Sequence, residues 1–573
     1  MSGGLTLPAS LDWLGRPALT ADPGLAGHVV VVLLWRLGCD DCQEAAAELE
    51  QVVRAMGERP FVVVAAQVPT NTAERDRARQ QRAAAARPFA ACVDAQRELV
   101  ASLQAKALPF VALFAADGER KFASPGVPQR QRLLEAIDAL LADAEHEGRR
   151  ALVPFVPYAE PPRREPVALL AEPDRLWLAT AASRQVHELD HAGAVLRTFG
   201  SGAPGGTDGE PSHQQFVRPA ALLGLPDHVL VADQGAHTLR ALDRHSGCSE
   251  TWSGTGRRSA DRTGGAYARD QGLCTPSALL ALDGTVVVAA TAARQLWQFD
   301  PGTRAAAAWL GSGERRARSP EDVVFQAPHG LATRAGAGQG GELLVADAGA
   351  DAIVAIDLAH LRARVRWAGV PRPVAVLGHE GAVFVAAAFG PAILHAPCVV
   401  ADEPLRPLFG TEHGLVEPVA LAAHGTTLWI ADAGADVVWV ADLAEPARGL
   451  VPLPLADLPT KVAEPAPRAT LLATARLAAH SDVVLRLRVP AAIGDERIEI
   501  DVVDAGAKRL AVPRHAVVVP RDGVAELLLP MDEPGTGALR VRMRTSVGTR
   551  HVVVPIEVVD GGASALDLVD PAR

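Results

Sequence analysis

The sequence predicts three folded parts: an α/β domain, a ring of six four-stranded β units and an antiparallel β-sandwich or barrel. Three observations predict this organisation. Strand-length apolar runs alternate with helix-length Ala, Glu and Arg stretches near the N-terminus, a repeat with a spacing of 45 to 57 residues fills the middle, and a period-2 pattern occupies the end. At 573 residues, the chain has room for three or four domains of about 100–200 residues each.

The first part, residues 1–150, reads as a sheet covered by helices on both faces. Strand-length apolar runs alternate with helix-length polar stretches, as is typical of βαβ units. The strand runs are 28–35 and 61–68, and the helix stretches that follow them are 41–56 and 74–86.

A hairpin is expected next, over residues 109–126, because the turn dipeptide Asp117-Gly118 separates two β runs. A helix over about 128–145 closes the domain. The Pro-dense stretch 151–164 then reads as a linker.

The middle part, residues 165–460, is a repeat in which a proline opens an apolar strand and a small or acidic residue ends the next strand. The prolines are Pro166, Pro219, Pro276, Pro328, Pro373 and Pro418, and the residues paired with them are Thr180, Asp233, Ala290, Asp347, Ala387 and Asp432. The two residues of a pair are 14 positions apart in five copies and 19 in the fourth, where 335–341 reads as a loop insertion. Each copy holds about four short strands, so six copies predict a closed six-bladed all-β propeller.

Three copies are plain in the sequence, at 231–243, 345–357 and 430–442. Their VADxG pattern, together with the spacer that contains Asp208-Gly209, resembles NHL repeats, a propeller family found in binding proteins and in a few enzymes. The resemblance is degenerate in the first, third and fifth copies. The Asp of each VADxG turn reads as a structural residue that accepts backbone N–H bonds, and not as part of a metal ring.

The last part, residues 465–573, alternates apolar and polar residues in segments such as 482–489, 538–545 and 551–559. This pattern predicts an antiparallel β-sandwich or barrel of about 100 residues. The part contains no cysteine. We therefore expect it to pack or to bind, and not to catalyse.

Composition excludes several classes of protein. A net charge of −11 and a pI near 5.9 disfavour a nucleic-acid-binding protein. The longest apolar run, 29–35, is far shorter than the roughly 20 residues that span a bilayer, and the N-terminus lacks a signal-peptide pattern. We expect a cytoplasmic protein that binds neither nucleic acid nor membrane. Four scattered cysteines read as buried small hydrophobic residues, namely Cys92, Cys248, Cys274 and Cys398.

The sequence Cys39-Asp40-Asp41-Cys42 follows the first strand and opens a helix. This spacing brings two thiols within disulfide range, and the first lies at a helix N-terminus, where unpaired N–H groups stabilise a thiolate. Cys39 is therefore the expected nucleophile and Cys42 the resolving thiol. A zinc site would need two further ligands of similar spacing, and none is present, so no metal or cofactor is predicted. A fold retained for binding alone remains an alternative.

A family resemblance enters at these residues. The strand, Trp35 four residues before the first cysteine, the C-x-x-C motif and Leu108-Pro109 before a hairpin resemble thioredoxin. The resemblance implies a cis peptide at Pro109 that faces the disulfide, and adds Trp35 and Pro109 to Cys39 and Cys42 as site residues. The order of the three domains resembles the NHL repeat-containing protein 2 family.

Two features depart from the thioredoxin pattern. Gly38 stands where many thioredoxins have tryptophan, and Leu33 stands where they have the buried acid that serves the resolving thiol. In addition, Asp40 and Asp41 oppose a thiolate beside them. We therefore expect Cys39 to titrate near or above the free-thiol pKa of about 8.5.

Cations in the loops between blades read as solvated loop charge, with a basic rim as the alternative. They are Arg257, Arg258, Arg262, Arg315, Arg316 and Arg318. His329 and His395 read as single histidines without partners.

Two functions follow from these features. The first is a thiol-disulfide oxidoreductase-like protein, in which Cys39 attacks a protein or small-molecule disulfide, or a peroxide, and the propeller binds a partner or substrate. The alternative is a non-catalytic scaffold whose thioredoxin-like domain only docks partners. A reachable Cys39 beside Pro109, facing the propeller, would favour the first. A propeller hydrolase or lyase would need a metal-binding set that the sequence does not offer.

Overall fold

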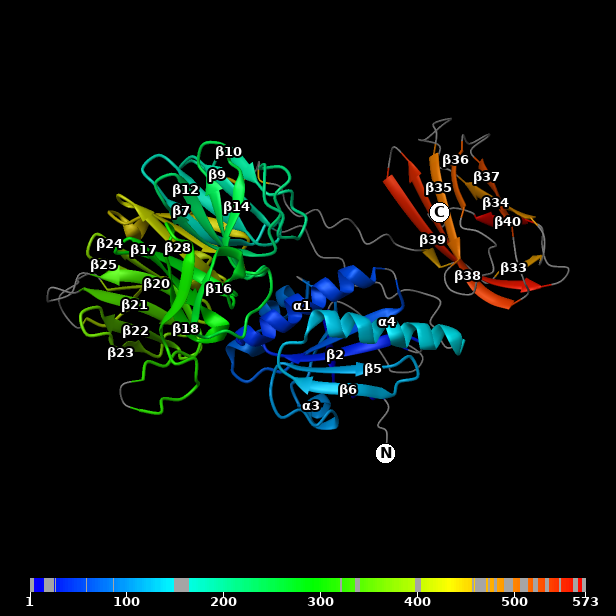
Figure 1. Ribbon diagram of the computed structural model, residues 1–573, viewed down its shortest axis with the longest axis horizontal. Coiled ribbons are helices and arrows are strands. Elements are labelled where there is room, and N and C mark those ends of the chain that lie inside the picture. The colour runs from blue at the N-terminus through cyan, green and yellow to red at the C-terminus, as the bar shows by residue number, and fades with distance from the viewer. Residues whose placement is uncertain are drawn as a thin grey trace.

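A computed structural model describes residues 5–14, 25, 27–57, 59–85, 87–148, 164–319, 322–334, 341–396, 403–455 and 458, and the strands between 470 and 568. Figure 1 shows a mixed α/β body in blue and cyan, a ring of sheets in green and yellow, and a β body in orange and red. The predicted fold class is confirmed: a thioredoxin-like domain, a six-bladed propeller and a two-sheet β domain. The predicted linker 151–164 and insertion 335–341 lie outside the described residues, except for one end residue each.

The thioredoxin-like domain is one six-stranded mixed sheet of order β1-β4-β3-β2-β5-β6. Its central strands β2 and β3 are buried along their whole length, as their continuous apolar runs predict. The neighbours β2, β3 and β4 run parallel, and β5 and β6 form the predicted hairpin. The bounds are β1 (Asp12–Trp13), β2 (Val29–Trp35), β3 (Phe61–Gln67), β4 (Ala90–Val93), β5 (Phe110–Phe114) and β6 (Arg120–Pro125).

Helices cover both faces of this sheet, and each face has its own core. α1 and α4 pack together on one face, where Leu49 and Ile137 belong to the same apolar cluster, and α3 contributes Leu99 to the cluster on the other face. The second helix is shorter than expected: it begins at Arg77, because the Asp76 carboxylate accepts the N–H of Arg79 at 2.7 Å and caps it. The bounds are α1 (Asp40–Met56), α2 (Arg77–Ala85), α3 (Glu98–Ser102) and α4 (Arg130–His146).

Each blade of the propeller is made of four consecutive strands that run from the innermost outward, and the third blade gains β15, which precedes β16 in the chain and pairs with β19 as a fifth, outermost strand. Blades 1 to 3 are β7 (Pro166–Ala171), β8 (Leu176–Thr180), β9 (Gln185–Leu189) and β10 (Val195–Phe199); β11 (Pro219–Gly224), β12 (His228–Asp233), β13 (Thr238–Asp243) and β14 (Ser249–Ser253); β15 (Gly264–Tyr267), β16 (Pro276–Leu282), β17 (Thr285–Ala290), β18 (Gln295–Phe299) and β19 (Ala305–Leu310). Blades 4 to 6 are β20 (Pro328–Arg334), β21 (Glu342–Asp347), β22 (Ala352–Asp357) and β23 (Arg362–Ala368); β24 (Pro373–His379), β25 (Ala382–Ala387), β26 (Ala392–Ala396) and β27 (Arg406–Phe409); β28 (Pro418–His424), β29 (Thr427–Asp432), β30 (Val437–Asp442) and β31 (Val451–Pro452).

The six prolines of the repeat occupy one structural position. Each is the first residue of its blade's innermost strand, and each pairs with the small or acidic residue that the repeat associates with it. The register shifts directly after every one of these prolines. A missing ladder N–H is tolerated at the first residue of a strand or beside a bulge, which is why proline recurs there.

No strand is exchanged where the ring closes, and blade 6 and blade 1 meet through side-chain contacts. Leu178 of β8 and Trp429 of β29 belong to one apolar cluster across this seam. The carboxylate of Asp436 also accepts the backbone N–H groups of Arg164 and Glu165, at 3.0 and 2.6 Å. The first and last blades are therefore joined by one cluster and one side-chain cap.

The VADxG aspartates are structural, as predicted. Asp432 is fully buried and accepts the N–H groups of Val416, Glu417 and Ala435 at 2.8 to 2.9 Å. Asp233 and Asp347 accept equivalent backbone N–H groups in their blades. No cluster of metal-ligating side chains occurs among the described residues.

The C-terminal domain consists of two sheets, β32-β39-β38-β35-β36 with β33 beside β39, and β37-β34-β40. Most neighbours are antiparallel, but β32 and β33 pair parallel with β39, and β34 pairs parallel with β40. These parallel partners are far apart in the sequence, which gives the long connection that parallel pairing needs. The bounds are β32 (Thr470–Leu471), β33 (Ala475–Ala478), β34 (Asp482–Arg488), β35 (Ile498–Asp504), β36 (Arg514–Val518), β37 (Val524–Pro530), β38 (Gly535–Thr545), β39 (Gly548–Val559) and β40 (Ala565–Leu568).

Candidate redox site at the domain interface

Cys39 and Cys42 form a disulfide at the N-terminus of α1, with a Cα–Cα distance of 5.1 Å. Cys39 is the N-cap residue, and its Sγ accepts the N–H of Cys42 at 3.2 Å. Cys42 is fully buried, whereas Cys39 is partly exposed. The predicted distance, helix position and relative exposure of the two thiols are therefore confirmed.

Pro109 and Trp35 lie at the same edge of the sheet as the motif. Leu34 of β2 pairs with Phe110 of β5, so the preceding Pro109 comes next to the end of β2, from which the loop to Cys39 leaves. The peptide bond between Leu108 and Pro109 is cis, as expected. Trp35 is 1% exposed and belongs to the domain core, with the Arg87 guanidinium 5.3 Å from its ring centre.

The propeller covers the start of this motif, and this explains Gly38. A Cβ at Gly38 would lie 2.8 Å from the ring of Phe389, which comes from the turn after β25. The guanidinium of Arg372 donates to the carbonyl of Gly38 at 3.1 Å, and it lies 5.3 Å from the same ring. A propeller aromatic thus occupies the space beside the position that is tryptophan in many thioredoxins.

Asp40 is bound by an arginine and a histidine of the propeller. Its Oδ1 accepts hydrogen bonds from Arg372 Nη2 and His329 Nε2, both at 3.0 Å. Burial alone would raise the pKa of Asp40, but the charges and hydrogen bonds of Arg372 and His329 outweigh it and hold the pKa well below its usual range. The expectation that His329 has no partner is therefore wrong.

Asp41 faces the loops of blade 3 and of the connection to blade 4. Arg258 Nη2 donates to its Oδ1 at 3.3 Å, and the guanidiniums of Arg294 and Arg315 lie 3.6 and 3.8 Å from its Oδ2. The interpretation of Arg258 as solvated loop charge is wrong, because the thioredoxin-like domain supplies its counter-charge, whereas the side chain of Arg315 is 70% exposed and remains a solvated loop charge near Asp41.

Glu44, one turn further along α1, also contacts the propeller. Its Oε2 forms an ion pair with Arg258 at 2.8 Å and accepts a hydrogen bond from Thr275 at 3.1 Å, and its other oxygen has no hydrogen-bond donor among the described residues. Burial raises the pKa of Glu44 to about 7, although Arg258 and Thr275 act against this shift. His237, 3.8 Å from Glu44, has its pKa lowered to about 4 by burial and nearby arginines, so it is neutral at pH 7 and forms no ion pair.

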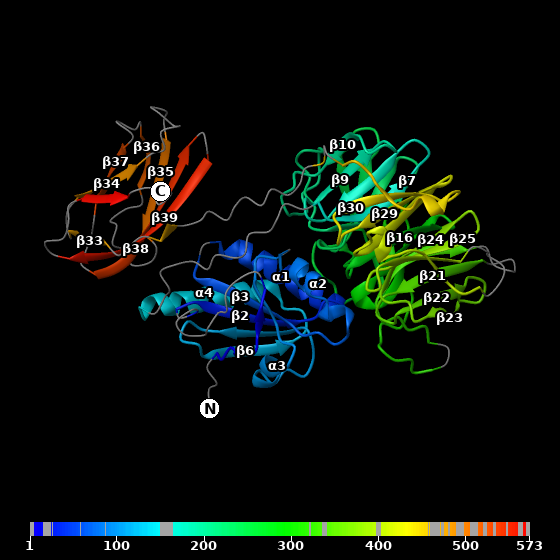
Figure 2. The same cartoon turned by 180° about the vertical axis from the view of Figure 1, so that it is seen from behind.

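A second buried carboxylate, Glu74, fixes the loop that carries the motif. It accepts the N–H of Gly38 at 3.0 Å and that of Thr70 at 2.8 Å, and it pairs with Arg36 at 3.2 Å. Close by, Arg79 of α2 donates to the carbonyl of Ala388 in the propeller at 3.1 Å. Figures 1 and 2 show α1 and α2 on the side of the domain that meets the propeller.

The sequence analysis missed Glu44, Glu74 and Phe389. Only Phe389 leaves a signal in the sequence: it replaces the glycine of the VADxG turn in the fifth copy, where Gly235, Gly349 and Gly434 stand in plainer copies. Those glycines are needed because a Cβ would approach the preceding loop within 2.7 to 2.8 Å. Leu33, at the position of the missing acid, is fully buried in β2.

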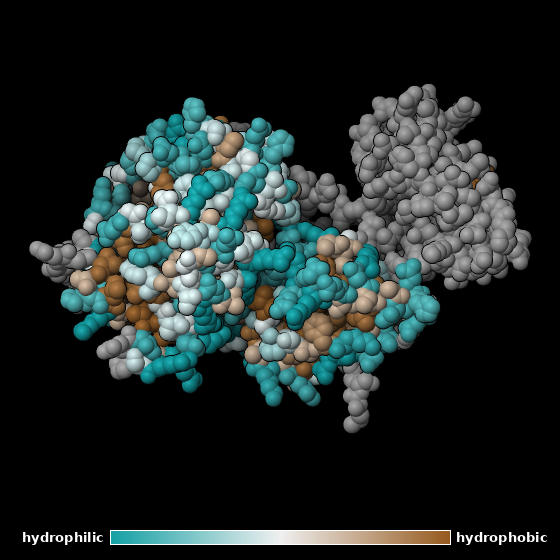
Figure 3. All heavy atoms as spheres, viewed as in Figure 1, coloured by the Kyte–Doolittle hydropathy of each residue, from teal (hydrophilic) through white to brown (hydrophobic). Residues whose placement is uncertain are grey.

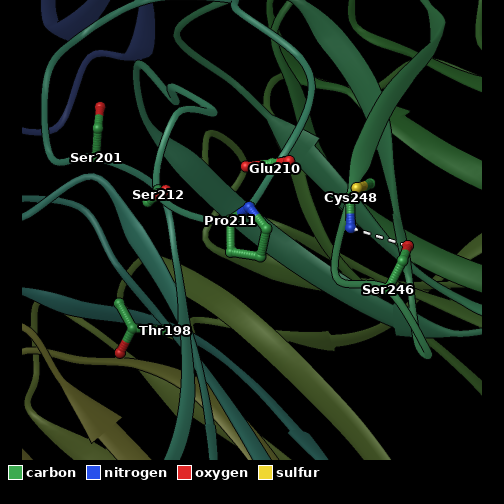
Figure 4. A pocket seen from close by; sticks show the side chains of 8 residues that line it. Thr198, Ser201, Glu210, Pro211, Ser212, Ser246 and Cys248 are labelled. Atoms are coloured by element: carbon green, nitrogen blue, oxygen red, sulfur yellow. Dashed lines mark hydrogen bonds between the residues drawn. The ribbon is translucent and has the colours of Figure 1, made fainter.

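A depression lies between blades 1 and 2, and its lining does not include Cys39 or Cys42. It encloses about 720 Å³, and Figure 4 shows Glu210, Ser212 and Cys248 around it, with the N–H of Cys248 bonded to Ser246. It is open to solvent and contributes nothing to the chemistry at Cys39. On the described part of the face in Figure 3, apolar side chains form separate patches and not one continuous surface.

The comparisons with known proteins are distant. No family model matches the sequence. One curated relative, Protein SUPPRESSOR OF QUENCHING 1, chloroplastic, of Arabidopsis thaliana, is 23% identical over 388 residues, which is 64% of this chain and 36% of that protein. The match thus spans about a third of the relative's length. No helix in the described part of the chain has the length and apolar character needed to cross a membrane.

Solved structures resemble the separate domains. A streptogramin B lyase is 12% identical with a TM-score of 0.34, over 52% of this chain and 85% of that chain. A thiol-disulfide isomerase from Corynebacterium glutamicum is 18% identical with a TM-score of 0.23, over 25% and 97%. Likenesses at this level carry no argument about activity.

Replacing Gly38 by alanine should weaken the contact between the domains. The new Cβ meets the Phe389 ring, and overpacking of this kind costs about 1–3 kcal/mol. Urea unfolding should show the loss for Gly38→Ala and its partial recovery in Gly38→Ala with Phe389→Leu, whereas Gly206→Ala, which has open space, serves as the control. Strictly additive effects of the two substitutions would contradict the contact.

Glu44 should make stability fall as the pH rises. The pKa of Glu44 in the folded protein, about 7, exceeds the ordinary value of 4.5, so the folded chain binds this proton more tightly than the unfolded chain. The resulting contribution to the free energy of unfolding is complete below pH 4.5 and is lost by about pH 7. Chemical unfolding at pH 5 and pH 8 should show that Glu44→Gln removes up to about 3 kcal/mol of this dependence. Exposed Glu135→Gln should leave it unchanged, and an equal pH dependence in both variants would refute the assignment.

Proposed function

We propose that the protein is a thiol-disulfide oxidoreductase in which the propeller completes the redox site of the thioredoxin-like domain. The observation that carries the proposal is the Cys39–Cys42 pair itself: the sulfur of Cys39, a partly exposed residue, caps α1, and the buried Cys42 lies within disulfide range. The domain order supports an assignment to the NHL repeat-containing protein 2 type. The cytoplasm stays the predicted compartment.

The reaction uses the two thiols in sequence. The Cys39 thiolate attacks a substrate disulfide, breaks its S–S bond and releases one substrate thiolate, which leaves a mixed disulfide. Cys42 then loses its proton to solvent and attacks Cys39 Sγ, and the second substrate thiolate departs as the Cys39–Cys42 disulfide forms. Two electrons pass from the protein to the substrate, whose thiolates take up two protons, and a dithiol reductant restores the pair.

The propeller changes the electrostatics expected of this site. Asp40 and Asp41 do not act on Cys39 as isolated negative charges, because Arg372 and His329 compensate the first and Arg258 the second. The helix N-terminus then acts on Cys39 without strong opposition. We therefore infer a Cys39 pKa below the free-thiol value, in place of the higher value expected from the sequence.

A non-catalytic interaction scaffold is the second candidate function. Phe389 and Arg372 cover Gly38 directly beside Cys39, so a bulky protein disulfide meets the propeller before it meets the sulfur. In a pure scaffold, the docked domains would bind partners without any reduction of disulfides.

The two candidates separate in a disulfide reduction assay with insulin and dithiothreitol. The wild-type protein should accelerate precipitation of the insulin chains, and Cys39→Ser should abolish the acceleration. Cys248→Ser is the matched control, because this partly exposed thiol lies in the depression between blades 1 and 2. Since a covered site disfavours large substrates, a small aromatic disulfide is assayed in parallel. Absence of wild-type activity on both substrates would favour the scaffold.

Arg372 should lower the pKa of Cys39. A unit charge about 7 Å away at an effective dielectric near 40 contributes about 1 kcal/mol, close to one pKa unit. The pH dependence of iodoacetamide alkylation, followed by mass spectrometry of the Cys39 peptide, should therefore give a midpoint about one unit higher in Arg372→Gln than in wild type. Exposed Arg304→Gln, paired with Glu250, should not move it. An unchanged midpoint in Arg372→Gln would remove the propeller from the redox site.

A further inference from the structure

Three propeller arginines gather around Asp41, next to the redox pair in the sequence. Arg258, Arg294 and Arg315 lie 3.3, 3.6 and 3.8 Å from its carboxylate oxygens. One carboxylate thus faces several guanidiniums.

The positive charge in this group exceeds its counter-charge. Glu44 and Asp41 share Arg258, at 2.8 and 3.3 Å, and Asp41 is also the carboxylate that faces Arg294 and Arg315. Both separations from Asp41 are longer than a hydrogen bond, and the Nε of Arg294 is buried without an acceptor among the described residues. Burial lowers the pKa of Arg294, and the neighbouring arginines lower it further.

The group opens to solvent on the side away from the core. Side-chain exposure rises from 14% at Arg294 to 70% at Arg315, with Asp41 at 24%. Asp41 lies two residues after Cys39 in the first turn of α1, about 3 Å further along the helix axis. A small molecule whose sulfur reaches Cys39 can therefore place a second group near the guanidiniums.

We propose that Arg294 and Arg315 bind an anionic group of the substrate, so that the site takes small disulfides that carry carboxylates. This rests on the proposed function and adds a substrate class to it. The carboxylate accepts hydrogen bonds from guanidinium N–H groups that Asp41 leaves unsatisfied, while Cys39 exchanges with the substrate's disulfide bond as described above. The arginines are specificity residues and take no part in the transfer of electrons.

The test compares two aromatic disulfides of similar size, the dianion dithiobis(nitrobenzoate) and the neutral dithiodipyridine. Pre-reduced full-length protein is mixed with each in single-turnover absorbance experiments, and each rate is divided by that of 2-mercaptoethanol to remove intrinsic reactivity. We expect a normalised preference of about tenfold for the dianion, at the lower end of electrostatic steering. Added salt of about 0.5 M should reduce it.

Variants assign the preference to these side chains. Arg294→Gln with Arg315→Gln should remove most of the preference, taken as the ratio of the two normalised rates, so that a change in Cys39 reactivity common to both disulfides cancels. Exposed Arg315→Gln alone should remove part of it, which keeps the test valid if the double variant folds poorly. Arg318→Gln is the matched control, since this arginine lies in the same loop but pairs with Glu314 at 3.0 Å.

The outcomes separate the two proposals. Reduction of both disulfides with no preference for the dianion, or a preference that survives loss of both arginines, would overturn the substrate class and leave the oxidoreductase intact. Failure to reduce either disulfide would overturn the oxidoreductase itself, and the substrate class with it.

Discussion

Carboxylates at the start of α1 can be buried only because the propeller supplies cations to meet them. Asp40, Asp41 and Glu44 all face the ring, and an unpaired charge in such a place is costly enough that it must neutralise or find a partner. Asp40 has Arg372 and His329 as partners and stays ionised, whereas Glu44, with one oxygen unsatisfied, holds its proton to about pH 7. The same ion pairs therefore hold the two domains together and determine the net charge around Cys39.

Much of the fold could be predicted from the sequence because its determinants are local. Proline at the first residue of an inner strand obeys a backbone rule that repeats in every blade, so the six positions and their partners could be found from spacing alone. The same holds for Cys39 and Cys42, whose separation and helix position follow from four adjacent residues. Even Phe389 left a trace, as an aromatic residue where the turn otherwise uses glycine.

The electrostatics of the site could not be predicted, because their sign depends on residues far away in the chain. Asp40 and Asp41 alone disfavour a thiolate, but Arg372 follows Asp40 by 332 residues and Arg258 follows Asp41 by 217. No pattern within either domain indicates which face of the propeller meets the helix. A histidine such as His329 reads as solitary for the same reason, since its partner belongs to another fold.

The seam of the ring has a mechanical consequence. In the described structure the propeller's first and last blades are neighbours, so the chain enters and leaves the ring at one place, with no strand shared across it. Tension between the two flanking domains would fall on the apolar cluster around Trp429 and on the carboxylate of Asp436, instead of on a ladder of backbone bonds. Under such tension, blades 6 and 1 should separate first, while the strands within every blade stay paired.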